Sequence, residues 1–310
     1  MSSNLNLTIA GARLQFHGSN GLHLVPTEFE YPPFLGEHAF DRIVTVDVSI
    51  ADGAAPAADQ VLFDSADGWL LMRHDDTYCA RMPVRSADGS YGAQDLWRLS
   101  WQQPLRHAYA HVHSDLVQDC AVRHFAQYPL DQIMLTTLLA SEGALLVHAC
   151  GGVTLAGGIA FAGVSGAGKS TLTRLLGDAP RSRFFSDDRL FIRRNDGLDG
   201  AVNTRPSEAR YQLHGTPWAG DAYVARNEHT TLDALCFLTQ ANTTRLVELT
   251  ATRALERLLP VATLPWFDAH TIGHALDACA ALVENVPCYE LLFRPDRAQI
   301  EQVLAELCDA

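Results

Sequence analysis

The sequence predicts a β-rich N-terminal domain over residues 1–126, followed by an α/β P-loop domain over residues 127–310. Three observations support this prediction. Short β-branched and aromatic runs dominate the first part, apolar strands alternate with helices in the second, and a glycine-rich phosphate-binding motif stands between a strand and a helix. Because alternating strands and helices are typical of a sheet covered by helices, we expect the α/β class for the second domain.

Composition and charge narrow the class of protein. A length of 310 residues suggests about two domains, and the balance of 47% hydrophobic to 19% charged residues is typical of a folded chain. A formal net charge of −13 argues against binding to nucleic acid or to an anionic membrane. The seven cysteines include no CxxC pair, which favours reduced thiols in the cytoplasm. The first residues show no signal-peptide pattern, and the uncharged stretch 143–168 is interpreted as two buried strands.

The N-terminal region reads as a series of short strands. Turn signals such as Ala51-Asp52-Gly53 separate them. We expect this domain either to recognise an acceptor molecule or to serve a structural or homo-oligomerising role. The runs that predict strands are 43–50, 61–64, 69–74, 77–83 and 96–101.

Strands and helices alternate after Pro129, a residue that suits the first turn of a helix. Apolar strands on either side of a turn at Gly151-Gly152 are expected to lead into the phosphate-binding loop. The predicted helices are 130–140, 169–176, 250–259, 273–285 and the last residues of the chain, and the predicted strands are 144–149, 158–164, 184–188, 189–194, 232–238 and 288–294.

The phosphate-binding motif is GVSGAGKS, residues 163–170, which matches GxxxxGK[ST] in full. Its glycines let the backbone curl so that successive N–H groups point at phosphate oxygens, and the following helix adds its positive end. Lys169 is expected to contact the β- and γ-phosphates of ATP, and the Ser170 hydroxyl to ligate Mg²⁺. The predicted nucleotide-binding residues are Gly163, Ser165, Gly166, Ala167, Gly168, Lys169, Ser170 and Thr171.

Two neighbouring carboxylates, Asp187 and Asp188, follow the next apolar run. Such a pair can divide its roles, with one carboxylate toward Mg²⁺ and one accepting a proton from the attacking hydroxyl, and like charges close together raise one pKa. His148 ends an apolar strand before the loop, where it is either a structural residue or a third member of the site.

The stretch VHACGGVTLAGGIAFAGVSGAGKSTLTRLL, together with FFSDDRLFIRR, resembles the catalytic domain of HPr kinase/phosphorylase. That family has a His followed at this distance by a P-loop embedded in strands, a short helix and an Asp-Asp pair. The resemblance implies a fold akin to phosphoenolpyruvate carboxykinase. It also implies that Asp188 accepts the hydroxyl proton, that His148 matches the family's His, and that Lys169 binds phosphate. Asp187 is then the carboxylate of the pair that is expected to ligate Mg²⁺.

The sequence departs from this family between residues 204 and 221, where the family's glycine-rich signature with its Mg²⁺-binding Glu is missing. Glu208 is the expected replacement, with Asp221 as the alternative. Because residues 1–126 do not resemble the family's N-terminal domain, HPr itself is not the expected substrate. The later segments 215–220 and 287–296 look like divergent HPr-kinase-like proteins, some of which are encoded beside ribosomal-peptide genes.

These observations predict ATP- and Mg²⁺-dependent phosphorylation of a hydroxyl group, in a Ser or Thr of a peptide or protein. Two alternatives remain open at this point. One is a kinase for a free small molecule, and the other is a nucleotide-binding module that regulates a partner without catalysis.

Overall fold

A computed structural model describes two compact units, Met1–Leu138 and Leu139–Ala310, and each is considered by itself. The described residues are 4–26, 29–53, 60–65, 68–85, 91–123, 125–177, 179–195 and 210–308. The division falls within helix α1 (Leu130–Ala140), and the domain boundary predicted at residue 126 stays a prediction.

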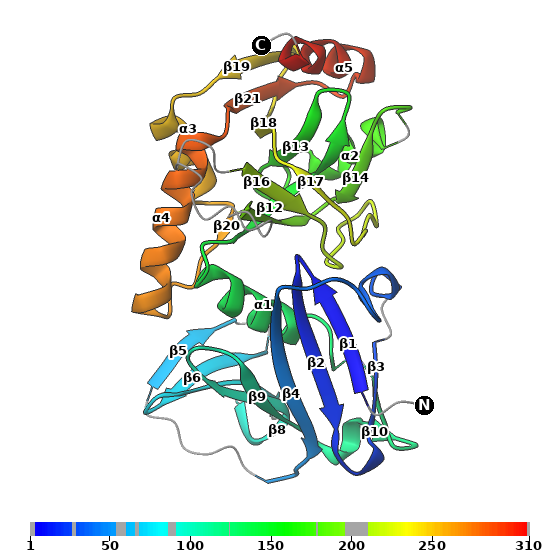
Figure 1. Ribbon diagram of the computed structural model, residues 1–310, viewed down its shortest axis with the longest axis vertical. Helices are drawn as coiled ribbons and strands as arrows, with labels where there is room; N and C mark the ends of the chain where they lie inside the picture. Colours follow the sequence, from blue (N-terminus) through cyan, green and yellow to red (C-terminus); the bar gives the residue numbers. More distant parts are fainter. Residues whose placement is uncertain are drawn as a thin grey trace. The chain divides into compact units, whose positions relative to one another are not determined.

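The first unit consists mainly of two sheets (Figure 1). An eight-stranded sheet has the order β1-β2-β4-β9-β8-β7-β6-β5, and a three-stranded sheet has the order β10-β11-β3. The strands are β1 Asn4–Ile9, β2 Ala12–Gly18, β3 His23–Val25, β4 Arg42–Ile50, β5 Gln60–Asp64, β6 Leu70–His74, β7 Thr77–Arg85, β8 Tyr91–Gln102, β9 His107–Val112, β10 Val117–Gln118 and β11 Ala121–Arg123, with short 3-10 helices η1 Ser19–Gly21, η2 Pro32–Phe34 and η3 Ser114–Leu116.

Alternation along β4 explains why the first unit forms a sheet with a buried face. Val44, Val46 and Val48 are fully buried, while their neighbours along the strand point outward. The buried Tyr31 hydroxyl donates a hydrogen bond to Asp131 Oδ2 (2.7 Å) and so satisfies a carboxylate inside this unit.

The second unit is built on a ten-stranded mixed sheet. Its main order is β17-β16-β15-β12-β13-β18-β21-β19, and β14 and β20 also pair with β12. The strands are β12 Leu145–Thr154, β13 Gly157–Ala162, β14 Arg183–Ser186, β15 Arg189–Asn195, β16 Arg210–His214, β17 His229–Thr231, β18 Ala234–Gln240, β19 Arg245–Glu248, β20 Ala262–Thr263 and β21 Cys288–Phe293; the helices are α2 Lys169–Leu176, α3 Ala251–Leu258, α4 Ala269–Asn285, α5 Arg297–Ala305 and η5 Glu306–Cys308.

Helices cover both faces of this sheet, as Figure 1 shows. Ala160 and Ala162 of β13 face a core shared with α3 and α4. Ile159 and Phe161, the alternate residues of the same strand, face a second core shared with α2 and α5. Because side chains alternate along a strand, β13 contacts both cores, and it leads directly into the loop that is predicted to bind phosphate.

The predicted α/β P-loop kinase fold, akin to HPr kinase and phosphoenolpyruvate carboxykinase, is wrong as a fold class. The structure is mostly β, with 45% strand and 23% helix and with large mixed sheets. Among the described residues, parallel pairing in the second sheet is confined to β13–β18 and β18–β21. The other pairs are antiparallel. For β12 and β13 the reason is local: a parallel crossover needs a dozen or more residues, whereas two residues separate these strands.

The turn predicted at Gly151-Gly152 is also wrong, because β12 runs straight through both glycines to Thr154. A Cβ atom on Gly151 would lie 2.2 Å from the carbonyl oxygen of Ile159, and one on Gly152 would lie 2.2 Å from that of Arg183. Close packing of the neighbouring strands on β12, rather than a chain reversal, therefore requires these glycines.

Individual helices agree better with the sequence. Helices α1 and α2 have the predicted bounds, α3 lies within the predicted range, and α4 begins four residues earlier than predicted. Within the described part of the chain, the helices are too short or too polar to cross a membrane.

Candidate functional site

The loop Gly163–Gly168, which is predicted to bind phosphate, joins β13 to α2, and two of its glycines, Gly163 and Gly168, stand where side chains do not fit. Gly168 occupies the N-cap position of α2 with φ +104°, and a Cβ atom there would lie 2.7 Å from Cζ of Phe293. A Cβ atom on Gly163 would lie 2.6 Å from that of Ala167. At Gly168, therefore, only glycine satisfies both the backbone angle and the space, whereas at Gly163 the space alone requires it.

Lys169 opens α2 and is only 6% exposed. Its ammonium donates to the carbonyl oxygens of Gly163 (2.9 Å) and Val164 (3.3 Å), so the loop folds back onto the lysine. Burial lowers the pKa of Lys169, against the opposing effect of the nearby Asp188 charge. Lys169 is also the single lysine of the chain, in which every other permanent cation is an arginine.

His148 and Asp188 meet beside the loop. The imidazole Nε2–H donates to Asp188 Oδ1 over 2.7 Å, and both side chains are partly exposed. Arg189 Nε lies 3.5 Å from Asp188 Oδ2. Burial opposes ionisation of Asp188, but the hydrogen bond from His148 and the neighbouring positive charges outweigh it, so the pKa of this carboxyl lies below its ordinary value. The sequence argument had expected proximity to Asp187 to raise a pKa of the pair.

The topology brings these two residues together from distant parts of the chain. His148 lies on β12, and its backbone pairs with Arg189 at the start of β15. Asp188 occupies the short connection between β14 and β15, which both run along the same edge of β12. Since strand register fixes this juxtaposition, the pair is part of the rigid sheet.

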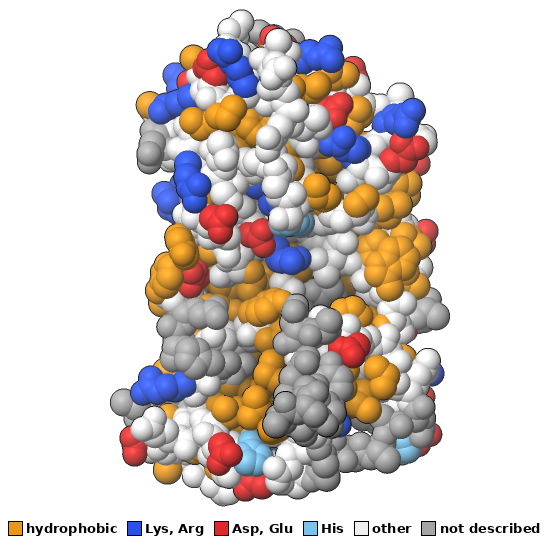
Figure 2. Space-filling model, turned by 180° about the vertical axis from the view of Figure 1, so that it is seen from behind, with side chains coloured by type: hydrophobic (Ala, Val, Ile, Leu, Met, Phe, Trp, Pro, Cys, Tyr) orange, Lys and Arg blue, Asp and Glu red, His pale blue; other side chains and the backbone are white. Residues whose placement is uncertain are grey.

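A pocket of about 390 Å³ gathers most of the predicted site residues. Gly163 and Ala167 shape the loop without lining this pocket, and Glu208 lies outside the described residues. The pocket is lined by His148, Ser165, Gly166, Gly168, Lys169, Ser170, Thr171, Arg174, Asp188, Gly220, Asp221 and Gln240. On the face of the second unit that Figure 2 shows, acidic and basic side chains are interspersed.

Asp187 does not line this pocket, although it is predicted to bind Mg²⁺. Its carboxylate is 1% exposed and accepts hydrogen bonds from three backbone N–H groups, those of Gly220, Ala222 and Val224. The predicted metal role therefore has no support from this geometry, whereas Asp221 lines the pocket.

Sequence reasoning missed three residues of the pocket, Arg174, Gly220 and Gln240. Arg174 lies four residues after Ser170 on α2 and so shares its helix face, a spacing that could have revealed it. Gln240 ends β18, and its side-chain amide donates to the carbonyl oxygen of Gly166 (2.7 Å). No local pattern signals this contact, because it depends on the pairing of β18 with β13.

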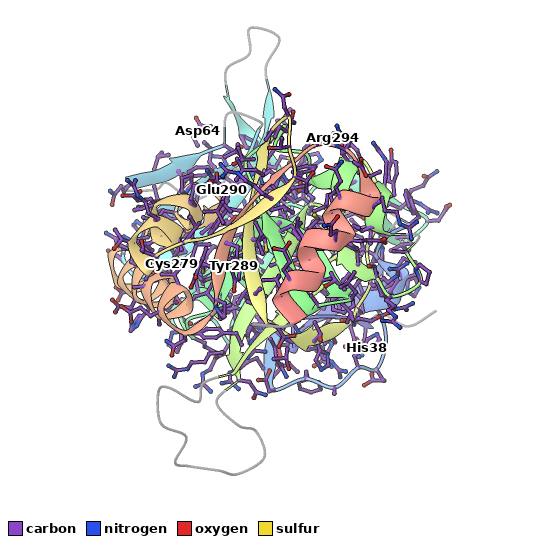
Figure 3. All side chains as sticks on the ribbon, turned by 90° about the horizontal axis from the view of Figure 1, so that it is seen from above. His38, Asp64, Cys279, Tyr289, Glu290 and Arg294 are labelled. Atoms are coloured by element: carbon purple, nitrogen blue, oxygen red, sulfur yellow. The ribbon has the colours of Figure 1, made fainter. Side chains whose placement is uncertain are left out.

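A polar network holds the end of β18 next to the loop. Glu290 of β21, labelled in Figure 3, accepts hydrogen bonds from Thr239 Oγ1 (2.6 Å) and Arg257 Nη1 (3.0 Å). Arg257 also donates to the carbonyl oxygen of Leu238 (3.1 Å). The strand that carries Gln240 is thus fixed by neighbours on α3 and β21.

Comparison with models of protein families gives no match to the chain, and comparison with curated proteins gives none either. Within the described part, there is no group of three or more His, Cys, Asp or Glu side chains arranged to hold a metal ion. The resemblance to HPr kinase stays a prediction that rests on the order of the motifs.

Proposed function

We propose that this chain is an ATP- and Mg²⁺-dependent phosphotransferase that phosphorylates a hydroxyl group, in a Ser or Thr of a peptide or protein. One observation carries the proposal: a phosphate-binding loop with its lysine and a histidine-paired carboxylate line the same pocket. These are the two components that phosphoryl transfer to a hydroxyl requires, a cradle for the donor and a proton acceptor for the nucleophile.

The nucleotide side rests on the loop and on Lys169. The ammonium that now donates to the carbonyl oxygens of Gly163 and Val164 has the charge and reach to donate to phosphate oxygens instead. The N-terminal end of α2 adds backbone N–H groups and its positive dipole.

The hydroxyl side rests on Asp188. Its lowered pKa keeps it ionised at neutral pH, and the hydrogen bond from His148 fixes its orientation. A weak base suffices here because phosphoryl transfer depends mainly on positioning and charge neutralisation. We therefore assign Asp188 to accept the hydroxyl proton and His148 to hold that carboxylate in place.

The oxygen donors in the pocket suit Mg²⁺, which commonly takes one or two carboxylates together with substrate phosphates. Ser170 and Asp221 line the pocket, so these residues fit the ion better than the buried Asp187 does, and Asp188 is left to act as the base. When bound, Mg²⁺ neutralises charge on the β- and γ-phosphates.

The acceptor class comes from the motif order in which the chain resembles HPr kinase, and label transfer tests it. Purified protein is incubated with Mg²⁺ and γ-labelled ATP, either with a degenerate mixture of Ser- and Thr-containing peptides or with small hydroxy compounds. We expect label on peptide hydroxyls from the wild type and loss of that label in Asp188→Asn. Label on a small hydroxy compound but not on peptides would contradict the peptide acceptor and favour a small-molecule kinase. Mg·ATP binding without transfer to either kind of acceptor would favour a nucleotide-binding regulatory module.

A further inference from the structure

The segment Gly220–Val224 is held from inside by one carboxylate. Asp187 Oδ1 accepts hydrogen bonds from the N–H groups of Gly220 (2.9 Å) and Val224 (3.1 Å), and Oδ2 accepts from that of Ala222 (2.7 Å). A carboxylate that accepts several backbone N–H groups makes charge-assisted bonds, which are about twice as strong as neutral ones. Because Asp187 is buried, water does not compete for these bonds.

The backbone of the segment Gly220–Val224 packs closely against Asp187 and Asp188. A Cβ atom on Gly220 would lie 3.0 Å from Asp187 Oδ2 and 3.2 Å from Cβ of Asp188. Tyr223 has φ +55°, an uncommon backbone angle for a bulky residue, and its N–H donates to the carbonyl oxygen of Gly220 (3.0 Å). Such a conformation persists only where surrounding contacts over-determine it.

The outer side of the loop belongs to the pocket. Gly220 and Asp221 line it together with Asp188, and Arg174 Nη2 donates to the carbonyl oxygen of Asp221 (2.8 Å). A hydroxyl that gives its proton to Asp188 lies within hydrogen-bond reach of it, about 2.6–3.2 Å. Whatever group carries that hydroxyl therefore meets the loop beside Gly220.

We propose that Asp187 is a positioning residue, which builds the loop Gly220–Val224 as the pocket wall beside the base Asp188. This inference rests on the proposed function for the role of Asp188, and it replaces the predicted Mg²⁺ role of Asp187. The two adjacent carboxylates thus have different partners: Asp187 binds the N–H groups of the wall, and Asp188 lines the pocket.

The test is amide hydrogen exchange of the protein without nucleotide or Mg²⁺, comparing the wild type with Asp187→Asn. An asparagine side chain has one carbonyl oxygen, so it can replace Oδ1 or Oδ2 but not both. Its NH2 group takes the other place, and at least one loop N–H then faces a second donor instead of an acceptor. We expect exchange within residues 220–224 to accelerate by at least about tenfold, the effect of losing one charge-assisted hydrogen bond. We also expect ATP turnover to fall by about tenfold or more.

A second pair of variants keeps the test decisive if Asp187→Asn unfolds. Gly220→Ala pushes the loop away from Asp187, whereas Gly273→Ala in α4 adds a Cβ with no atom within 4 Å. Faster loop exchange in Gly220→Ala but not in Gly273→Ala supports the proposal.

Unchanged loop exchange in a folded Asp187→Asn protein, together with a shifted Mg²⁺ dependence, would overturn the proposal and restore Asp187 as a metal ligand. Equal loop exchange in Gly220→Ala and Gly273→Ala would also overturn it. If the wild type turns over no ATP, the proposed function fails, and the exchange measurements still decide whether Asp187 builds the loop.

Discussion

Gly168→Ala is expected to destabilise the second unit strongly, because it combines two separate costs. Placing a side chain at a left-handed backbone position costs about 1–2 kcal/mol, and Gly168 has φ +104°. The new methyl group would also lie 2.7 Å from Cζ of the buried Phe293, and overpacking of this kind costs about 1–3 kcal/mol. The expected loss in free energy of unfolding is therefore about 2–5 kcal/mol.

The same loop provides a matched control. Gly166 also has a positive φ, +78°, but a Cβ atom there would meet nothing within 4 Å. Gly166→Ala should therefore cost only the backbone term, about 1–2 kcal/mol. Equilibrium urea unfolding followed by circular dichroism measures both variants under identical conditions.

The difference between the two variants isolates the contact with Phe293. We expect Gly168→Ala to be less stable than Gly166→Ala by about 1–3 kcal/mol. Equal losses would show that the loop does not press against Phe293 as described. That result would refute the steric explanation of this glycine.

Three further predictions concern the charged groups. Asp188→Asn should lower phosphoryl transfer by about 100-fold or more while Mg·ATP binding stays within a few-fold, measured by label transfer and calorimetry. The pKa of Asp188 is lower in the folded than in the unfolded protein, so this carboxylate stabilises the fold above the unfolded value of about 3.9, and the stabilisation disappears as the pH falls through the folded pKa. Unfolding midpoints of the wild type should therefore drop more steeply in acid than those of Asp188→Asn. Parallel pH curves for the two proteins would contradict this. Burial lowers the pKa of Lys169, and contact with phosphate should raise it again, so Mg·ATP binding at alkaline pH should take up protons. Calorimetry in buffers of different ionisation enthalpy measures this uptake. Binding enthalpies that are the same in all buffers would contradict the prediction.

The loop before α2 was the part of the structure that the sequence predicted best. The glycines of residues 163–168 and the start of α2 at Lys169 follow from the motif itself, because its spacing requires a tight turn into a helix. The resemblance to HPr kinase implied that His148 and Asp188 belong to the same site, and the register of β12 with β15 brings them into contact.

Strand pairing was not predictable, and this explains the wrong fold class. An apolar run such as Leu145–His148 fits either a parallel or an antiparallel neighbour, and composition does not distinguish them. Gly151 and Gly152 were interpreted as a turn, since close approach of flanking strands leaves the same glycine signal as a chain reversal.

The orientation of Asp187 depended on long-range contacts. Its three N–H donors lie more than thirty residues further along the chain, so no local pattern indicates that the carboxylate points inward. The sequence identified an acidic pair and assigned Asp187 to Mg²⁺, because the N–H groups that this carboxylate binds are not visible in the local pattern.

The most direct test of the nucleotide site is Mg·ATP binding by the wild type and by Lys169→Ala, with Lys169→Arg as a control that keeps the charge. As Lys169 is the single lysine, amine-selective labelling followed by mass spectrometry reports on this side chain without interference from other lysines. We expect Lys169→Ala to weaken binding at least tenfold, consistent with loss of a charge-assisted contact worth about 1.5–3 kcal/mol, and Mg·ATP to protect Lys169 from labelling. Undiminished affinity in Lys169→Ala, together with labelling of Lys169 that Mg·ATP does not slow, would contradict the account.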